Sequence, residues 1–267
     1  MPRKKVKAHA DYKTVLVLTD IHVPEHDELT LEPVLKFIGD EWWDYVLDLG
    51  DLMDFNSISF FNHGKPRLVG DDSLDHDYDV ANQILDARDA AVLKNNPDAI
   101  RVQLQGNHEH RVERLLDEQP QLGEVTIGVE HNLRLEERGI EWVKSWNDGT
   151  TYKIGKAHFH HGLYTNLHHA KKMVEEFGCN IFYGHTHDIQ TYSKVFQGRD
   201  KTLQGSSLGC LCKYEQRYMR GRPNKWQQAI AVFHIFPDGF FQKNVIPIFK
   251  HRFVSPTTGK VYQKKLR

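Results

Sequence analysis

The chain has 267 residues, of which 39% are hydrophobic and 27% are charged. This composition suits a soluble globular enzyme and excludes a disordered or fibrous chain. The formal net charge is -1, so no global field draws the protein to nucleic acid or to anionic lipid, and any attraction to phosphates must be local.

The cysteine content and the N-terminus both indicate a cytoplasmic protein. An odd number of cysteines excludes a complete disulfide framework, and the spacing of Cys210 and Cys212 does not suit a CxxC redox or zinc motif. We therefore expect reduced thiols. The basic N-terminus is followed by a short apolar run at 15–18, which cannot form a signal or membrane segment. We expect no membrane partner.

Five short β-rich runs end in polar turns. The runs are 13–19, 43–49, 99–105, 156–160 and 179–183, and the turns that follow them read DIH, GDLMD, GNHE, HG and GHTH. Short β-rich runs closed by glycine are typical of buried strands. The sequence therefore predicts five strands with chemistry-bearing residues at their carboxyl ends.

Helical patterns separate these runs. Residues 73–96 have apolar side chains at helical spacing, with Asp72 available as N-cap, and residues 108–118 begin a helix directly after the third turn. Residues 167–178 end on a glycine that suits a C-cap. Strands that alternate with helices predict an α/β fold, in which ligands gather at the carboxyl ends of strands.

The C-terminal part has a different pattern. Residues 229–249 predict a β-hairpin with a PDG turn that completes a sheet. We expect one domain over 1–267, with a motif core at 13–190, a loop-rich insertion at about 55–72 and a β-rich part at about 200–267.

The polar groups at the five strand ends are carboxylates, one amide and imidazoles, which are ligands of Mn, Fe, Zn or Ni. Cysteine is absent from all five turns, which argues against a structural zinc site. Each turn alone has a simpler explanation: Asn107 could cap a helix, and the two histidines of GHTH could lie on opposite faces of a strand. Five such turns in one chain are hard to reach by chance, so together they predict a metal centre.

The motifs DxH, GDxxD, GNHE, HG and GHTH stand in this order over residues 20–187, about two thirds of the chain. In this order they resemble the calcineurin-like metallophosphoesterase family, and the Gly-Ser turn at 204–207 resembles one that many members carry. The resemblance implies an α/β/β/α sandwich of two mixed β-sheets flanked by helices, with a dinuclear metal site at one edge.

The resemblance also implies a ligand set and a reaction. Two cations about 3.5–4 Å apart can clamp the attacking and leaving oxygens of an in-line phosphoryl displacement, with metal-bound hydroxide as the nucleophile. We expect two divalent ions, manganese first, with iron, zinc or nickel as alternatives. One ion is assigned to Asp20, His22, Asp51 and His187, and the other to Asp51, Asn107, His161 and His185, with Asp51 as the bridge.

Two further residues are implied as catalytic. His108 of GNHE would stabilise the phosphate and protonate the leaving oxygen, and Asp54 would orient its imidazole. The alternative for Asp54 is a helix N-cap. In the sequence HFHHG the family pattern selects His161 as the ligand, while strand alternation places His158 and His160 together on the other face.

The substrate prediction depends on positions where this chain differs from the protein Ser/Thr phosphatase branch of the family. The protein Ser/Thr phosphatase branch carries one arginine soon after GDxxD and another just before GNHE, where this chain has Phe55, Asn56 and Gln105. DIHVP also lacks the glycine that follows the first histidine of that branch. These departures favour a phosphodiesterase that acts on phosphate esters, nucleic acid or nucleotides among them. A phosphomonoesterase or protein phosphatase is the alternative, and a non-catalytic scaffold is a remote third possibility because no ligand is missing.

Residues 213–228 interleave basic and aromatic side chains, a pattern that can hold a sugar-phosphate backbone and stack bases. The alternative is a solvated loop. The sequence makes no prediction of the oligomeric state. The candidates for substrate contact are Arg217, Arg220, Arg222 and Trp226.

Overall fold

The computed structural model describes residues 9, 11–62, 64–70, 73–144, 146–197, 202–216, 219 and 221–264. Its larger sheet has six strands in the order β11-β10-β1-β2-β3-β4. Neighbours from β1 to β4 are parallel, while β10 is antiparallel to both β1 and β11. The strands are β1 (Lys13–Leu18), β2 (Tyr45–Asp48), β3 (Ile100–Leu104), β4 (Ile140–Val143), β10 (Ala229–Ile235) and β11 (Phe241–Pro247).

The second sheet has five strands in the order β5-β6-β7-β9-β8. Its central strands β6, β7 and β9 are parallel, and the edge strands β5 and β8 are antiparallel to their neighbours. A separate two-stranded ribbon joins β12 (Arg252–Val254) to β13 (Val261–Gln263). The strands of the second sheet are β5 (Tyr152–Ile154), β6 (Ala157–His160), β7 (Asn180–Tyr183), β8 (Thr191–Val195) and β9 (Thr202–Ser207).

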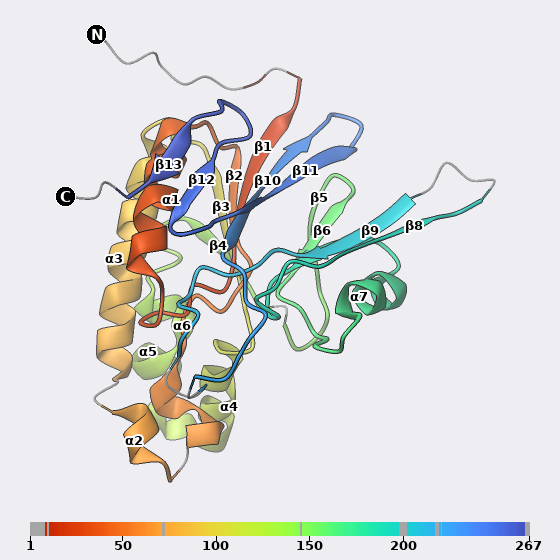
Figure 1. Ribbon diagram of the computed structural model, residues 1–267. Coiled ribbons are helices and arrows are strands. Elements are labelled where there is room, and N and C mark those ends of the chain that lie inside the picture. Colours follow the sequence, from red (N-terminus) through yellow and green to blue (C-terminus); the bar gives the residue numbers. More distant parts are fainter. Residues whose placement is uncertain are drawn as a thin grey trace.

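Helices cover the outer faces of the two sheets. In Figure 1, α1 (Glu28–Asp40) and α3 (Leu74–Leu93) flank the larger sheet, and α7 (His169–Phe177) flanks the smaller one. The predicted α/β/β/α sandwich is therefore confirmed. The shorter helices and turns are η1 (Asn56–Ile58), η2 (Phe60–Asn62), α2 (Pro66–Val69), α4 (His110–Glu118), η3 (Pro120–Leu122), α5 (Glu124–Ile127) and α6 (Val129–Asn132).

The alternation of side chains along the strands explains the layers. Along β1, Val15 and Val17 face the second sheet, where they share an apolar cluster with Phe159. Leu16 and Leu18 point to the opposite face and pack in the cluster that includes α1 and α3. A strand that is apolar on both faces is buried on both faces, which is why the run at 13–19 shows no polar alternation.

Several predicted elements are confirmed, with two differences. The hairpin of β10 and β11 is present, and Gly178 caps α7 in the left-handed region at φ 62°. Asp72 lies outside the described residues, and the N-cap of α3 is Ser73, whose side chain accepts a hydrogen bond from the amide of His76. Sequence patterns missed α1, since Pro33 lies inside it and proline usually interrupts a helix.

The three cysteines are free thiols, as expected. Among the described residues, no helix is both long and apolar enough to span a membrane.

The apolar layer between the sheets makes a stability prediction. Phe233 is fully buried and contacts the rings of Phe159, Phe182 and Phe241. Phe233→Ala should lower the free energy of unfolding in denaturant by about 3–5 kcal/mol, because it leaves a cavity that rigid neighbours cannot fill. Phe249→Ala, at a ring that is 68% exposed, should change it by less than about 0.5 kcal/mol. Equal losses in both variants would contradict this account.

Candidate metal centre

Five loops meet at one edge of the sandwich, and each follows a strand whose carboxyl end reaches that edge. Parallel pairing of β1, β2 and β3 brings their carboxyl ends together, and parallel pairing of β6 and β7 does the same in the second sheet. Backbone bonds tie the loops to one another: the amide of His22 donates to the carbonyl of Asp51 at 2.9 Å, and the amide of Gly184 donates to that of His161 at 2.8 Å.

The first donor group is Asp20, His22, Asp51 and His187. The Nε2 atom of His187 lies 3.0 Å from Oδ1 of Asp20 and 3.0 Å from Nε2 of His22. The Nε2 atom of His22 lies 3.7 Å from Oδ2 of Asp51. Donor atoms at these separations suit a shared cation with ligand bonds of about 2.0–2.2 Å.

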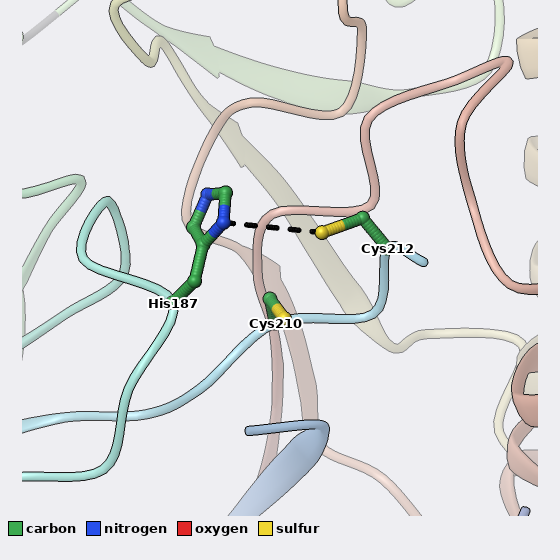
Figure 2. Close-up of side chains that lie close together, drawn as sticks. All are labelled: His187, Cys210 and Cys212. Atoms are coloured by element: carbon green, nitrogen blue, oxygen red, sulfur yellow. Dashed lines mark hydrogen bonds between the residues drawn. The ribbon is translucent and has the colours of Figure 1, made fainter. Parts of the chain in front are cut away.

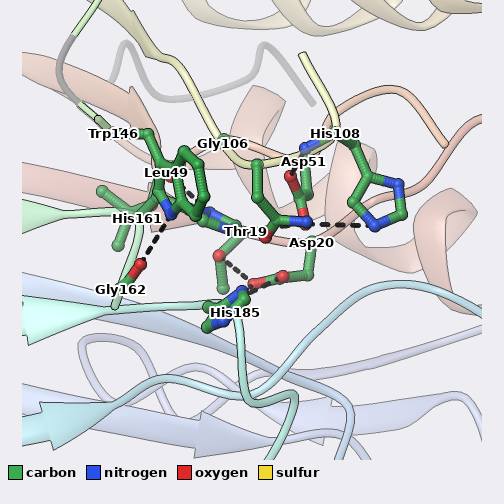
Figure 3. A network of polar contacts seen from close by, with 12 residues as sticks. Thr19, Asp20, Leu49, Asp51, Gly106, His108, Trp146, His161, Gly162 and His185 are labelled. Carbon is green, nitrogen blue, oxygen red and sulfur yellow. Dashed lines mark hydrogen bonds and ion pairs between the residues drawn. The ribbon is translucent and has the colours of Figure 1, made fainter. Parts of the chain in front are cut away.

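The second donor group is Asp51, His161 and His185, with Asn107 beside it. The Nε2 atom of His161 lies 3.2 Å from Oδ2 of Asp51 and 3.0 Å from Oδ1 of Asn107. Its Nδ1 atom lies 3.0 Å from the carbonyl oxygen of Leu49, which can only accept, so Nδ1 carries a proton and Nε2 is the nitrogen that faces the site. Figure 3 shows His161, Asp51 and His185 near one another, each on a different segment of the chain.

The backbone at these positions is unusual. Nine non-glycine residues of the described chain have positive φ, and five of them are predicted ligands. Non-glycine residues avoid this region unless their surroundings hold them there, and such strain concentrates at functional sites. The five are Asp20, His22, Asp51, His185 and His187.

Two motif glycines are required by close approach. A Cβ atom on Gly106 would stand 2.2 Å from Oδ1 of Asp51, and one on Gly184 would stand 2.1 Å from Oδ2 of Asp20. Both distances are far shorter than any van der Waals contact. The glycines of GNHE and GHTH therefore leave room for the carboxylates of the neighbouring loops.

The charges of the buried groups fit cations. Burial raises the pKa of Asp20 and Asp51, but the surrounding imidazoles outweigh it and hold both well below the usual range. Burial lowers the pKa of His161, but the carboxylate of Asp51 outweighs it and brings the pKa to about 9. The pocket therefore stabilises a positive charge at His161, whose Nε2 atom is one of the donors. These oxygen and imidazole donors could hold divalent metals.

The carboxylate of Asp54 contacts two imidazoles. The nearer one is that of His22 and not that of His108, the predicted partner. Its Oδ1 atom lies 2.9 Å from Nδ1 of His22 and 3.3 Å from Nδ1 of His108. The carboxylate therefore fixes the ring of a candidate ligand, so that Nε2 of His22 faces the donor group. The structure also places Asp54 outside any helix.

His108 is held by the backbone and by Arg111, an arginine outside the predicted site residues. Its Nδ1 atom lies 2.7 Å from the carbonyl oxygen of Asp54, so Nδ1 carries the proton. Arg111 donates through Nη1 to the same carbonyl at 2.7 Å and through Nη2 to Nε2 of His108 at 3.0 Å. Residues three apart share a helix face, so the spacing of Arg111 from GNHE was a readable signal.

Glu109, the last residue of GNHE, ties two loops together without facing the donors. It is fully buried, and its carboxylate accepts hydrogen bonds from the amides of Asp51 at 2.9 Å, Met53 at 3.0 Å and Gly106 at 2.8 Å. Burial, together with the charge of Asp51, raises its pKa to about 7. Glu109 therefore positions the bridge candidate through the backbone.

The ambiguity in HFHHG has a structural answer. His161 faces Asp51, whereas His160 packs against the ring of Phe177 on α7 and accepts a hydrogen bond from the amide of Gly162 at 2.8 Å. Trp146 secures the same turn, because its indole nitrogen donates to the carbonyl of Gly162 at 2.9 Å. His160 thus stabilises the turn, and His161 belongs to the donor group.

Two cysteines lie behind His187, which the sequence did not indicate. Figure 2 shows the thiol of Cys212 directed at the imidazole, with 3.9 Å between Sγ and Nδ1, and Cys210 beside it. Both thiols are buried. Because Nε2 of His187 faces Asp20, the sulfur atoms lie on the other side of the ring and support it from behind.

Within the described part of the segment at 213–228, Trp226 reaches the centre. The ring of Trp226 lies 4.3 Å from that of His187, and the amide of Gln227 donates to the carbonyl of His187 at 2.7 Å. Arg222 is exposed. The other two candidates in this segment, Arg217 and Arg220, lie outside the described residues.

No family model matches the chain. Two phage proteins are similar in sequence. The Gene 54 protein of Mycobacterium phage L5 is 25% identical over 266 residues, which cover 94% of this chain and 99% of that protein. The Gene 54 protein of Mycobacterium phage D29 is 26% identical over 256 residues, covering 90% and 96%.

Solved structures with some similarity include a metallophosphoesterase from Sphaerobacter thermophilus, with a TM-score of 0.43 and 15% identity. The match covers 86% of this chain and 88% of that one. The nuclease MPE of Pseudomonas putida gives TM-score 0.37, 13% identity and coverage of 87% and 86%. Vps29 of Entamoeba histolytica in complex with zinc gives a TM-score of 0.38 and 14% identity, and the match covers 88% of this chain and 98% of that one. Similarity at this level carries no information about activity.

The close approach at Gly184 yields a prediction. Gly184→Ala should displace the Asp20 carboxylate, because the new methyl group would overlap it, and should lower the metal content measured by mass spectrometry after dialysis. Gly39→Ala is the matched control: Gly39 lies in α1, and its Cβ would stand 3.5 Å from Cβ of Ala91 on α3, an ordinary contact. The control should retain metal and unfold at the same or a higher temperature. Normal metal content in Gly184→Ala would show that the loop tolerates the overlap.

Proposed function

We propose that the protein is a metal-dependent phosphoesterase that hydrolyses phosphodiesters, with nucleic acid or nucleotides as the substrate class. One observation carries this proposal: two groups of oxygen and imidazole donors share the Asp51 carboxylate at the edge where the two sheets meet. Two bound divalent ions would supply Lewis-acid stabilisation of the phosphoryl oxygens and an activated water.

The chain's own residues would bind and orient the phosphate. His108 keeps a proton on Nδ1, bonded to the Asp54 carbonyl, so Nε2, which accepts a hydrogen bond from Arg111, is the nitrogen that a substrate would meet once Arg111 gives way. Nε2 lies 3.7 Å from Oδ2 of Asp51, beside the donor groups. From this position, a His108 ring that has gained a second proton on Nε2 can donate to a phosphoryl oxygen or pass that proton to the leaving oxygen, and it then returns to the neutral form with its proton on Nδ1. Arg111 adds positive charge beside the same nitrogen, with Nη2 3.0 Å from Nε2 of His108.

The preference for a diester rests on the side chains that the turns lack. A diester carries one negative charge at the scissile phosphate, so two cations and one imidazole are enough to hold it. Phe55, Asn56 and Gln105 occupy the positions where the protein phosphatase branch has arginines. Trp226 against His187 gives an aromatic surface beside the centre that suits a nucleobase.

A phosphomonoesterase is the second candidate, and Arg111 favours it. An arginine does reach the edge of the site, although from α4 rather than from the two positions considered in the sequence. Both of its terminal nitrogens are engaged with Asp54 and His108, which makes it a support for the imidazole first. A panel with Mn²⁺ should decide: we expect higher kcat/KM for bis-nitrophenyl phosphate than for nitrophenyl phosphate, and turnover of single- or double-stranded DNA.

Metal dependence tests the proposed chemistry. A chelator should abolish the turnover of bis-nitrophenyl phosphate, and Mn²⁺ should restore it. Asp51→Asn should weaken both donor groups and should lower metal affinity or activity by more than the roughly 10–100-fold loss typical of outer-shell partners. Asp98→Asn, at an exposed residue, is the matched control. Full activity in excess chelator would refute the dinuclear chemistry.

His108 separates catalysis from metal binding. His108→Ala should retain metal and lose turnover by roughly 10²–10⁴-fold, the usual share of a general acid. The loss should be smaller for nitrophenyl esters than for alkyl esters, because a good leaving group needs little protonation. His131→Ala, at an exposed histidine of α6, should behave as wild type. Equal losses on both esters would assign His108 to phosphate binding instead.

A further inference from the structure

A cavity of about 640 Å³ lies between the η1–α2 segment and α4. Figure 1 shows α2 and α4 together at the end of the molecule away from the termini. Arg111 lines this cavity while it donates to Nε2 of His108. The cavity therefore adjoins the imidazole that would face the scissile phosphate.

The cavity is cationic. Among the described residues that line it, Lys65, Arg111 and Arg114 are positively charged, and Glu118 is the one acid. The chain as a whole has a net charge of -1, so this excess is local. A local positive surface beside a phosphoesterase centre attracts further phosphate groups of the same substrate.

The cavity also presents an aromatic ring to solvent. Phe60 lines it and is 73% exposed, and the neighbouring Phe61 is 75% exposed with its ring centroid 6.3 Å away. Two adjacent phenylalanines that stay out of the core leave a large apolar area in water, which marks a binding surface. A free aromatic face next to cations is the combination that binds single-stranded nucleic acid.

We propose that this cavity binds the nucleotide next to the scissile phosphate of a single-stranded nucleic acid. The flanking phosphate would lie on Arg114 and Lys65, and the base would stack on Phe60. The volume lies within the roughly 300–1,000 Å³ range of ligand sites. An unpaired base is required, because a duplex hides the faces of its bases in its own stack. This assignment rests on the proposed function, since it names the substrate of the same centre.

The test is direct binding without turnover. The probe is a fluorescein-labelled deoxyoligonucleotide of about ten nucleotides, a length within known site sizes, titrated with full-length protein in chelator. Phe60→Ala should weaken the affinity roughly tenfold, and Phe60→Tyr, which keeps the aromatic face, should retain it. The double variant Lys65→Ala/Arg114→Ala should flatten the plot of log affinity against log salt by about 0.7 for each lost phosphate contact.

Matched controls come from the remote surface. Phe249→Ala removes an exposed ring and Lys36→Ala an exposed cation of α1, and neither residue lines the cavity. Both should bind the probe as wild type does. Thermal melts of all variants should coincide, and Phe60→Tyr guards against a folding defect in Phe60→Ala.

Three outcomes would overturn the cavity assignment. The first is wild-type affinity for the oligonucleotide in the cavity variants, and the second is a loss of affinity in the two controls as large as that in the cavity variants. The third is an equal loss of affinity for a poly-glutamate peptide, which would show that the cavity recognises charge alone. Failure of the proposed function is seen separately, as wild-type protein that does not turn over bis-nitrophenyl phosphate with Mn²⁺. Binding in chelator does not depend on that result.

Discussion

The buried carboxylate of Asp51 is the constraint on which the rest of the site depends. It lies between two donor groups, and its two oxygens face different partners: Oδ1 accepts from the amide of His108 at 2.8 Å, and Oδ2 faces His161 at 3.2 Å. A buried carboxylate is costly unless it is neutralised and hydrogen-bonded. The surrounding imidazoles, the amide and the proposed cations together meet that requirement.

The loops around Asp51 are held by backbone contacts rather than by their own conformational preference. Positive φ at Asp51, His22 and His185 stores strain that must be offset elsewhere. Glu109 offsets part of it, because one buried carboxylate binds three amides from two loops. The parallel strands then supply the rigid base, since their apolar faces pack on both sides. A rigid base that holds strained loops is a preorganised site.

The surroundings of the donors differ from one side to the other, and this asymmetry shapes the proposed substrate. Trp226 and the thiol of Cys212 lie against His187. On the side of His108, Arg111 leads into a cationic cavity with an exposed Phe60. A symmetric small ester needs neither surface, whereas a strand with bases and several phosphates can use both.

The sequence by itself determined the fold class and the order of the motif turns, because both are local. Apolar runs closed by glycine mark buried strands, and their chemistry-bearing residues follow at fixed positions. What it could not give were contacts between residues distant in the chain. Arg111 reaching His108 and Asp54, Asp54 bonding to His22, and the cavity between η1 and α4 all depend on how separate loops pack. Helix α1 was missed for the opposite reason: a local proline signal was outweighed by the N-cap at Asp27 and by burial against the sheet. Packing alone decides such cases, because the free energy of burial belongs to the assembled layers and to no single segment.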